Sequence, residues 1–287
     1  MKVALVTGAG RGIGDATARQ LAQSGNHVIL TARRPETLEA EVERLNRDGH
    51  SASALQLDVT DRDSVQRAAD HVAATYGHLD VLVNNAGVLP EATNPDPAEV
   101  VDLEMFRITY ETNLIGAVAV LEAFLPLIRK SEAGRIVNVT STMGSLTDQT
   151  NPESPYYGMV LPAYQSSKAA LNNVTIALAK ALTETPVKVT SVCPGFVQTD
   201  LTPINRDNAP TTADQAAEVV VRAATLPDDA PSGRSSMPTV RCRGECRVSG
   251  LVSRPRSPRG GRRPGRGGRA SRGGSTSGCG RRTGCPG

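Results

Sequence analysis

The sequence predicts an α/β fold, a doubly wound parallel sheet with helices on both faces, for most of its 287 residues. Short apolar runs rich in β-branched residues alternate with longer segments of helical period. A glycine-rich turn joins the first run to the first helical segment, and 39% apolar residues are enough for one hydrophobic core. Such alternation favours right-handed crossovers between parallel strands. Because ligands of these sheets bind beyond the carboxyl ends of the strands, residues at strand ends are the candidates for function.

Six strands and six helices are expected, in strict alternation. The strands carry the runs of Val, Ile and Leu and cover residues 3–7, 27–32, 54–58, 79–84, 135–140 and 187–193. The helices carry apolar residues at helical spacing and cover residues 12–23, 35–48, 62–76, 99–129, 164–183 and 213–226. A single domain over residues 1–231 contains all of these elements.

Composition argues against several classes of protein. No run of about 18 apolar residues is present, so no membrane span is expected. The chain starts directly in an apolar strand, without the successive regions of a secretory signal, so a cytoplasmic protein is expected. Four of the five Cys lie beyond residue 231 with no His beside them, which favours neither a disulfide framework nor a zinc site.

The motif TGAGRGIG follows the first strand at residues 7–14, and a helix follows it at once. Glycine permits positive φ and a close approach of the backbone to a phosphate, and a helix N-terminus offers unpaired N–H groups to negative charge. An ordinary glycine-rich loop is the alternative interpretation. The predicted cofactor-binding residues of this turn are Gly8, Gly10, Arg11, Gly12, Ile13 and Gly14.

The end of the second strand indicates which cofactor the turn binds. It reads Thr31-Ala32-Arg33-Arg34, with Ala32 at the position where an acid would bind the ribose hydroxyls of NAD. Guanidinium groups suit bidentate contact with the extra phosphate of NADP, and Arg11 adds a further positive charge. NADP(H) is therefore expected, with Arg33 as its contact. For Arg33 and Arg34 the alternative is the solvated start of a helix.

Tyr164 and Lys168 stand four residues apart in a predicted helix, so their side chains project from the same face. A nearby cation favours the phenolate, whose ordinary pKa is about 10. Lowering that pKa by roughly three units requires about 4 kcal/mol, which one close Lys and a nicotinamide ring together can supply. Tyr164 is then a proton donor and acceptor near neutral pH.

The glycine turn and the Y-x-x-x-K motif together resemble the short-chain dehydrogenase/reductase (SDR) family, and the loop lengths resemble its carbonyl-reductase branch. The resemblance spans about residues 2–231 and implies a Rossmann-like fold. It implies that Ser141, after the fifth strand, orients the substrate, and that Asn113 holds a water of the proton relay. A strand cap for Ser141 and a polar residue at a helix kink for Asn113 are the alternatives. The implied catalytic residues are Asn113, Ser141, Tyr164 and Lys168.

The resemblance implies further cofactor contacts at the ends of the third, fourth and sixth strands. Asn84-Asn85-Ala86-Gly87 matches the family's N-N-A-G motif, for which plain turn chemistry is the alternative. Thr199, in Pro-Gly-Phe-Val-Gln-Thr, is implied to bind the nicotinamide carboxamide. The full implied set beyond the glycine turn is Arg33, Asp58, Val59, Asn85, Ala86, Gly87, Tyr164, Lys168, Pro194, Gly195 and Thr199.

The expected reaction is a hydride transfer between NADP(H) and a small-molecule carbonyl or secondary alcohol, without a metal. Tyr164 protonates the carbonyl oxygen, Ser141 hydrogen-bonds it, and Lys168 holds the nicotinamide ribose. The long helices 99–129 and 164–183 resemble those that pair between SDR subunits, so a homodimer or homotetramer is expected. A regulatory protein that binds NADP without turnover is the competing function.

Ser141 and Tyr164 are 23 residues apart, and the insert at residues 147–161 lies between them. An insert at the edge of the cleft is expected to form a substrate wall, with a lid or a surface elaboration as alternatives. Tyr156 and Tyr157 are not expected to be catalytic, because neither has a Lys four residues later.

Residues 232–287 form an Arg/Gly-rich tail with a formal charge of +13, which leaves −10 for the first 231 residues. Without aromatic residues or apolar periodicity, the tail is predicted to be disordered. Nucleic-acid binding through phosphates and a solvated extension are two interpretations, and the first lacks aromatic residues for base stacking. We prefer a third, a frameshift, because, if the serines after Arg234 use TCN codons, reading one base earlier can encode the Phe-Phe of the family's last strand. The chain would then lack that edge strand.

Overall fold

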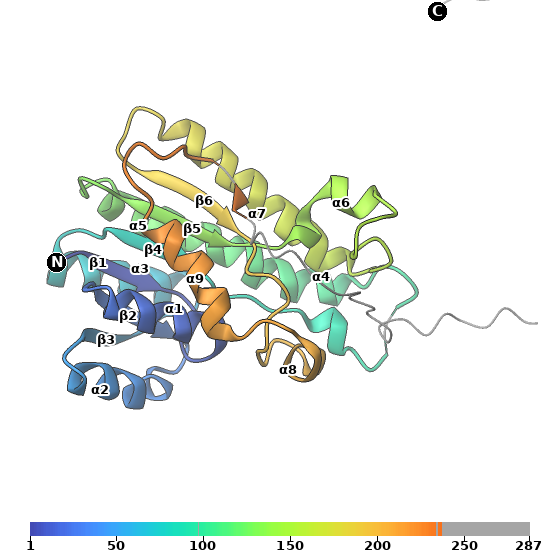
Figure 1. The fold of residues 1–287 in the computed structure, drawn as a ribbon, viewed down its shortest axis with the longest axis horizontal. Helices are drawn as coiled ribbons and strands as arrows, with labels where there is room; N and C mark the ends of the chain where they lie inside the picture. The colour runs from blue at the N-terminus through green and yellow to red at the C-terminus, as the bar shows by residue number, and fades with distance from the viewer. Residues whose placement is uncertain (97, 234, 237–287) are drawn as a thin grey trace, which may run out of the picture. The chain divides into compact units, whose positions relative to one another are not determined.

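The computed structural model describes residues 1–96, 98–233, 235 and 236, which form a parallel sheet with helices on both faces (Figure 1). The strand order is β3-β2-β1-β4-β5-β6-β7. The strands are β1 (Val3–Val6), β2 (His27–Ala32), β3 (Ser51–Gln56), β4 (Val81–Asn84), β5 (Arg135–Val139), β6 (Lys188–Val192) and β7 (Ser235–Ser236). The predicted doubly wound fold is confirmed. Because the chain crosses from β3 back to β4 beside β1, the loops after β1 and β4 diverge and open a crevice between them.

Two layers of helices cover the two faces of the sheet (Figure 1). One layer contains α1 (Gly12–Gln23), α2 (Glu39–Arg47) and α9 (Ala213–Ala224). The other contains α3 (Arg62–Tyr76), α5 (Ala117–Ile128) and α7 (Pro162–Ala181). Side chains of β1 alternate between the layers, since Ala4 and Val6 pack in the first and Leu5 in the second. Because both faces of the sheet are buried, most strand sequences are continuous apolar runs and do not alternate with polar residues.

The helix predicted at residues 99–129 begins later and is not regular. It consists of α4 (Leu103–Tyr110), the π-helical turn η3 (Glu111–Gly116) and α5. Gly116 packs so closely that a Cβ there would lie 2.8 Å from the carbonyl oxygen of Val59. The helix therefore lies directly against the loop after β3.

The segment Leu103–Ile128 is long and apolar enough to cross a membrane by length and composition, with a mean hydropathy of 1.5 in its most apolar window. Its α5 part, however, buries Val120, Phe124 and Ile128 completely in the core beside α3 and the sheet. We interpret it as a core helix of this domain.

Several short elements were not expected from the sequence. They are the 3-10 turns η1 (Pro35–Thr37), η2 (Pro90–Thr93) and η4 (Thr142–Gly144), and the helices α6 (Leu146–Thr150) and α8 (Pro203–Asn208). The third strand also differs, since it covers Ser51–Gln56 where residues 54–58 were predicted. Ser51 and Ser53 made its start look like a loop, but their hydroxyls hydrogen-bond the ring nitrogens of His27 on β2, at 2.7 and 3.1 Å.

The sheet continues past Pro231, where the domain was predicted to end. The N–H of Gly233 donates to the carbonyl oxygen of Val189 at 2.8 Å, and Ser235–Ser236 then pairs with β6 in parallel. The expectation that the edge strand is missing is therefore wrong for these two residues, because parallel pairing uses backbone groups and does not require the Phe side chains. Residues 237–287, on which the other tail predictions fall, lie outside the described residues.

Candidate active site

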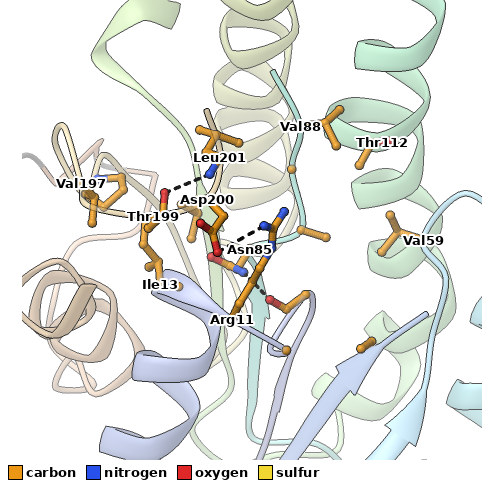
Figure 2. A pocket seen from close by; sticks show the side chains of 18 of the residues that line it. Arg11, Ile13, Val59, Asn85, Val88, Thr112, Val197, Thr199, Asp200 and Leu201 are labelled. Carbon is orange, nitrogen blue, oxygen red and sulfur yellow. Dashed lines mark hydrogen bonds and ion pairs between the residues drawn. The ribbon is translucent and has the colours of Figure 1, made fainter. Parts of the chain in front are cut away.

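A cavity of about 420 Å³ lies at the carboxyl ends of the central strands. Figure 2 shows its walls, with Arg11, Thr199 and Asp200 on one side and Val59 and Thr112 on the other. All but two of the predicted site residues line it: Gly8, Gly10, Arg11, Gly12, Ile13, Arg33, Asp58, Val59, Asn85, Ala86, Gly87, Ser141, Tyr164, Lys168, Pro194, Gly195 and Thr199. The exceptions are Gly14 and Asn113, which stand outside the lining.

The glycine turn needs its glycines for two different reasons. Gly8 and Gly12 have φ of +65° and +60°, a conformation that other residues adopt at a cost. Gly14 instead provides space, because a Cβ there would lie 2.4 Å from the carbonyl oxygen of Gly8 and 2.5 Å from Nδ2 of Asn85. Gly14 therefore lets the start of α1 pack onto the turn, and its direct contact with the cofactor stays a prediction.

The N-N-A-G segment fastens the end of β4 to the glycine turn. Nδ2 of Asn85 donates to the carbonyl oxygens of Thr7 and Gly8, at 2.9 and 3.2 Å. The N–H groups of Asn85 and Ala86 donate to Oγ1 of Thr7, at 2.9 and 3.0 Å. Nδ2 of Asn84, the last residue of β4, donates to Oδ1 of Asn138 on the neighbouring strand β5 at 2.9 Å. These contacts cross from one strand to another, so the motif does more than make a turn.

The side chain of Arg11 points toward Asp200 (Figure 2). Its guanidinium forms an ion pair with Asp200 at 3.5 Å, and Asp200 also pairs with Arg206 of α8 at 2.5 Å. The hydrogen bond from Arg206 and its positive charge hold the pKa of Asp200 below its usual value. Sequence reasoning did not single out Asp200, for which the one signal was an acid next to Thr199. Arg33 lines the cavity beside Ala32, as predicted.

Tyr164 is buried near the start of α7, and its phenol hydrogen-bonds the hydroxyl of Ser141. Burial raises the pKa of Tyr164 above its ordinary value, and the hydrogen bond from Ser141 only partly offsets this. Burial thus outweighs any lowering by Lys168, and the lowering expected from Lys168 together with a nicotinamide ring stays a prediction. The phenol is protonated at neutral pH and can donate its proton.

Lys168 is buried one helical turn after Tyr164, and its ammonium donates to the carbonyl oxygen of Val139 at 3.0 Å. Nζ lies 5.6 Å from the centre of the Tyr164 ring. Burial lowers the pKa of Lys168 to about 8. The two side chains share the cavity as predicted, but the ammonium is held by a strand end and not by the phenol.

Ser141 has two partners. As the residue before η4, its Oγ accepts the N–H of Met143 at 3.1 Å, so Ser141 caps this 3-10 turn rather than the strand. The cap fixes the serine side chain, and the same hydroxyl reaches the phenol of Tyr164. Capping here orients the hydroxyl toward the cavity.

Asn113 is fully buried in the π-helical turn and does not line the cavity. Its Oδ1 accepts the N–H of Val88 at 2.8 Å, and its Nδ2 donates to the carbonyl oxygen of Val88 at 2.9 Å. Nδ2 also lies 3.4 Å from Oγ of Ser167 in α7. The side chain thus joins the loop after β4 to η3 and α7, and the water contact of Asn113 stays a prediction.

Glu91 and Cys193 lie at the site and were not predicted. The carboxylate of Glu91 accepts the N–H groups of Ala163 and Tyr164 at the start of α7. The buried thiol of Cys193 accepts the N–H of Thr142 at 3.3 Å and lies close enough to Tyr164 to influence its pKa. Both residues make their contacts with segments distant in sequence, and such contacts leave no local motif that sequence reasoning can recognise.

The insert between Ser141 and Tyr164 folds as η4, α6 and a series of turns. Tyr156 comes near enough to Tyr164 for its charge to affect the pKa of that phenol, whereas Tyr157 is exposed. Among the described residues that line the cavity, none belongs to 147–161. The substrate-wall role of the insert therefore stays a prediction.

The family model for short chain dehydrogenase matches residues 2–209. Salutaridine reductase of Papaver bracteatum is 34% identical, over 81% of this chain and 93% of that protein. (+)-Neomenthol dehydrogenase of Capsicum annuum is 32% identical, over 81% of this chain and 94% of that protein.

A solved structure supports the same relationship. A metagenomic short-chain oxidoreductase in complex with NADP is 31% identical to this chain, with a TM-score of 0.66, and the match covers 83% of this chain and 98% of that one. Together with the cavity at the strand ends, these matches show that the chain belongs to the short-chain dehydrogenase family of oxidoreductases.

Proposed function

We propose that this oxidoreductase uses NADPH to reduce a carbonyl compound to a secondary alcohol, with Tyr164 as the proton donor. The observation that carries the proposal is the buried phenol of Tyr164, hydrogen-bonded to Ser141 inside the cavity that the glycine turn also lines. A phenol whose pKa is raised by burial is protonated over the whole physiological range. The protonated phenol suits carbonyl reduction, in which the carbonyl oxygen gains a proton.

The bound cofactor would supply a hydride to the carbonyl carbon, which forms a C–H bond as the C=O double bond becomes a single bond. The O–H of Tyr164 donates its proton to the carbonyl oxygen, which completes the alcohol. The hydroxyl of Ser141 donates a hydrogen bond to the same oxygen as negative charge develops on it. The phenolate left on Tyr164 is stabilised by the ammonium of Lys168, 5.6 Å from the ring centre.

The residues present fit a nicotinamide dinucleotide. Gly8 and Gly12 keep side chains off the turn, where a Cβ would lie 3.1 Å from Cα of Ala86 and from Cγ2 of Thr199, respectively. The N-terminus of α1 follows this turn and favours a pyrophosphate. At the other end Arg33 lines the cavity beside Ala32, which favours the phosphate of NADP over the diol of NAD. The NADP complex of the metagenomic relative is consistent with this choice.

A panel of aldehydes and ketones assayed with NADPH and with NADH tests the proposal. We expect NADPH oxidation that depends on the carbonyl, and a loss of about 100-fold or more in kcat for Tyr164→Phe, which keeps the ring but has no proton to donate. NADPH binding, followed by fluorescence, should persist in that variant. Binding of NADPH by the wild type without turnover of any carbonyl would instead favour a regulatory protein.

We also propose that two copies associate through the helices α4, α5 and α7. Exposed apolar side chains of these helices, and of η3 between α4 and α5, include Leu103, Ile108, Ile115, Val118 and Ile176. Exposed apolar side chains on adjacent helices are typical of a surface that contacts another protein. Light scattering after gel filtration should give the mass of a dimer or a tetramer, and Ile176→Glu should give a monomer.

A further inference from the structure

The catalytic helix α7 begins without a cap of its own. The residue before it is Leu161, whose side chain cannot accept a hydrogen bond, and Pro162 occupies the first helical position. The next two N–H groups belong to Ala163 and Tyr164 and have no acceptor within the helix. The backbone N–H of Tyr164, the proton donor of the proposed reaction, is therefore one of the groups for which the helix itself provides no hydrogen-bond acceptor.

Glu91 supplies the acceptor from another part of the chain. Its Oε1 accepts the N–H of Ala163 at 2.9 Å, and its Oε2 accepts the N–H of Tyr164 at 2.8 Å. The carboxylate belongs to η2, 73 residues before Tyr164 in the sequence. A negative charge at a helix N-terminus is favourable, and bonds from N–H groups to a carboxylate are stronger than those between neutral partners.

The segment that carries Glu91 is itself held in place at the site. It follows the N-N-A-G motif directly, and both backbone groups of Val88 are bonded by the side chain of Asn113. The loop after β4 thus contacts the cofactor region through Gly87, η3 through Val88 and α7 through Glu91.

We propose that Glu91 is a positioning residue for Tyr164. Its carboxylate fixes the backbone N–H of the proton donor itself and so keeps the phenol in its hydrogen bond with Ser141. This inference rests on the proposed function for its kinetic readout. The distinct alternative is a cap that stabilises α7 without affecting the chemistry.

Kinetics of Glu91→Ala separate the two interpretations, with Thr212→Ala as the matched control. Thr212 caps α9, away from the lining of the cavity, by accepting the N–H of Gln215 at 3.3 Å. We expect kcat of Glu91→Ala to fall by about 10- to 100-fold, because small misplacement of a reacting group has effects of this size. The KM for NADPH should stay within about two-fold, and the solvent isotope effect on kcat should rise as proton transfer becomes slower.

Glu91→Gln provides the conservative variant. The amide oxygen can still accept the N–H of Tyr164, but the amide nitrogen cannot accept that of Ala163, so kcat should recover part of the loss. Equal kcat values and isotope effects for Glu91→Ala and Thr212→Ala would overturn the proposal, since only a general loss of stability would then be present.

Titration of the Tyr164 phenol requires no substrate turnover. It therefore tests the role of Glu91 independently of the proposed carbonyl reduction. Absorbance of tyrosinate, with Tyr164→Phe subtracted, follows the ionisation of Tyr164 alone. In Glu91→Ala the loosened phenol should gain access to water, so its pKa should fall from the raised value toward the ordinary one. An unchanged titration would contradict the proposal even if no carbonyl substrate were found, and a lowered pKa would support it in that case too.

Discussion

Arg11 of the glycine turn and Asp200 of the loop after β6 form an ion pair at 3.5 Å across the mouth of the cavity. Asp200 therefore holds the guanidinium that sequence reasoning assigned to the cofactor phosphate. A carboxylate beside this cavity would also oppose the binding of the proposed cofactor NADPH. Both effects depend on charge and should weaken in salt.

We predict that Asp200→Asn binds NADPH more tightly, by about three-fold at low ionic strength, because it frees Arg11 and removes a negative charge. Fluorescence titration at two salt concentrations measures the change, which should shrink at the higher one. Asp70→Asn, an exposed acid on α3, is the control and should leave the Kd unaltered. Weaker binding by Asp200→Asn would mean that the acid orders the loop for the cofactor.

Ala32→Asp should change the cofactor preference. The new carboxylate would stand where it can accept hydrogen bonds from ribose hydroxyls and repel a phosphate beside Arg33. The ratio of kcat/KM for NADPH to that for NADH should fall by about ten-fold or more. Steady-state assays with both cofactors check this, and an unchanged ratio would show that the end of β2 does not determine the preference.

Gly14→Ala should destabilise the domain by about 2 kcal/mol or more, because its Cβ would overlap the carbonyl oxygen of Gly8 and the side chain of Asn85. Urea unfolding without NADPH measures the loss of stability, and the increase in stability on adding NADPH measures the effect of the substitution on binding. Gly158→Ala is the control, since a Cβ there meets nothing within 4 Å. Equal midpoints for the two variants would contradict the packing role of Gly14.

The lowered pKa of Lys168 predicts a pH dependence of stability. Between about pH 8 and its ordinary value of about 10.5, the unfolded chain binds a proton at this residue that the folded chain has lost. Stability from this group therefore rises with pH in that window. The raised pKa of Tyr164 has the opposite effect on stability: above about pH 10 the unfolded chain loses the phenol proton first, so the free energy of unfolding falls as pH rises. The measurement is therefore confined to pH values up to about 10.

Relative to Lys168→Met, the wild type without added cofactor should gain about 2 kcal/mol in free energy of unfolding from pH 8 to pH 10. Denaturant unfolding at intervals of half a pH unit gives this difference. A constant difference over the range would show that the lysine is not desolvated in solution.

Sequence reasoning located the glycine turn, the N-N-A-G segment, Ser141, Tyr164 and Lys168 because each belongs to a local pattern at a strand or helix end. It missed the contacts of Glu91 and Asp200, which join segments far apart and leave no periodic signal. The short elements η2 and α8 were missed because they are too brief to show a period.

The complete burial of Tyr164 and Lys168 was also missed, for a related reason. Spacing within a helix shows that Lys168 can lie beside the phenol, but it does not reveal how completely both groups are buried. Desolvation dominates in the structure, and it acts on the two residues in opposite directions.

Thr7 lies at the end of β1 and binds residues 85 and 86 at the end of β4 through its single hydroxyl. The crevice consequently cannot exist until these two strands pair, which closes a loop of more than seventy residues. A nascent chain that has not yet released β4 from the ribosome has no place to hold a dinucleotide. In the folded chain a bound dinucleotide would stabilise the whole sheet by mass action, so proteolysis through the unfolded chain would slow as the cofactor concentration rises.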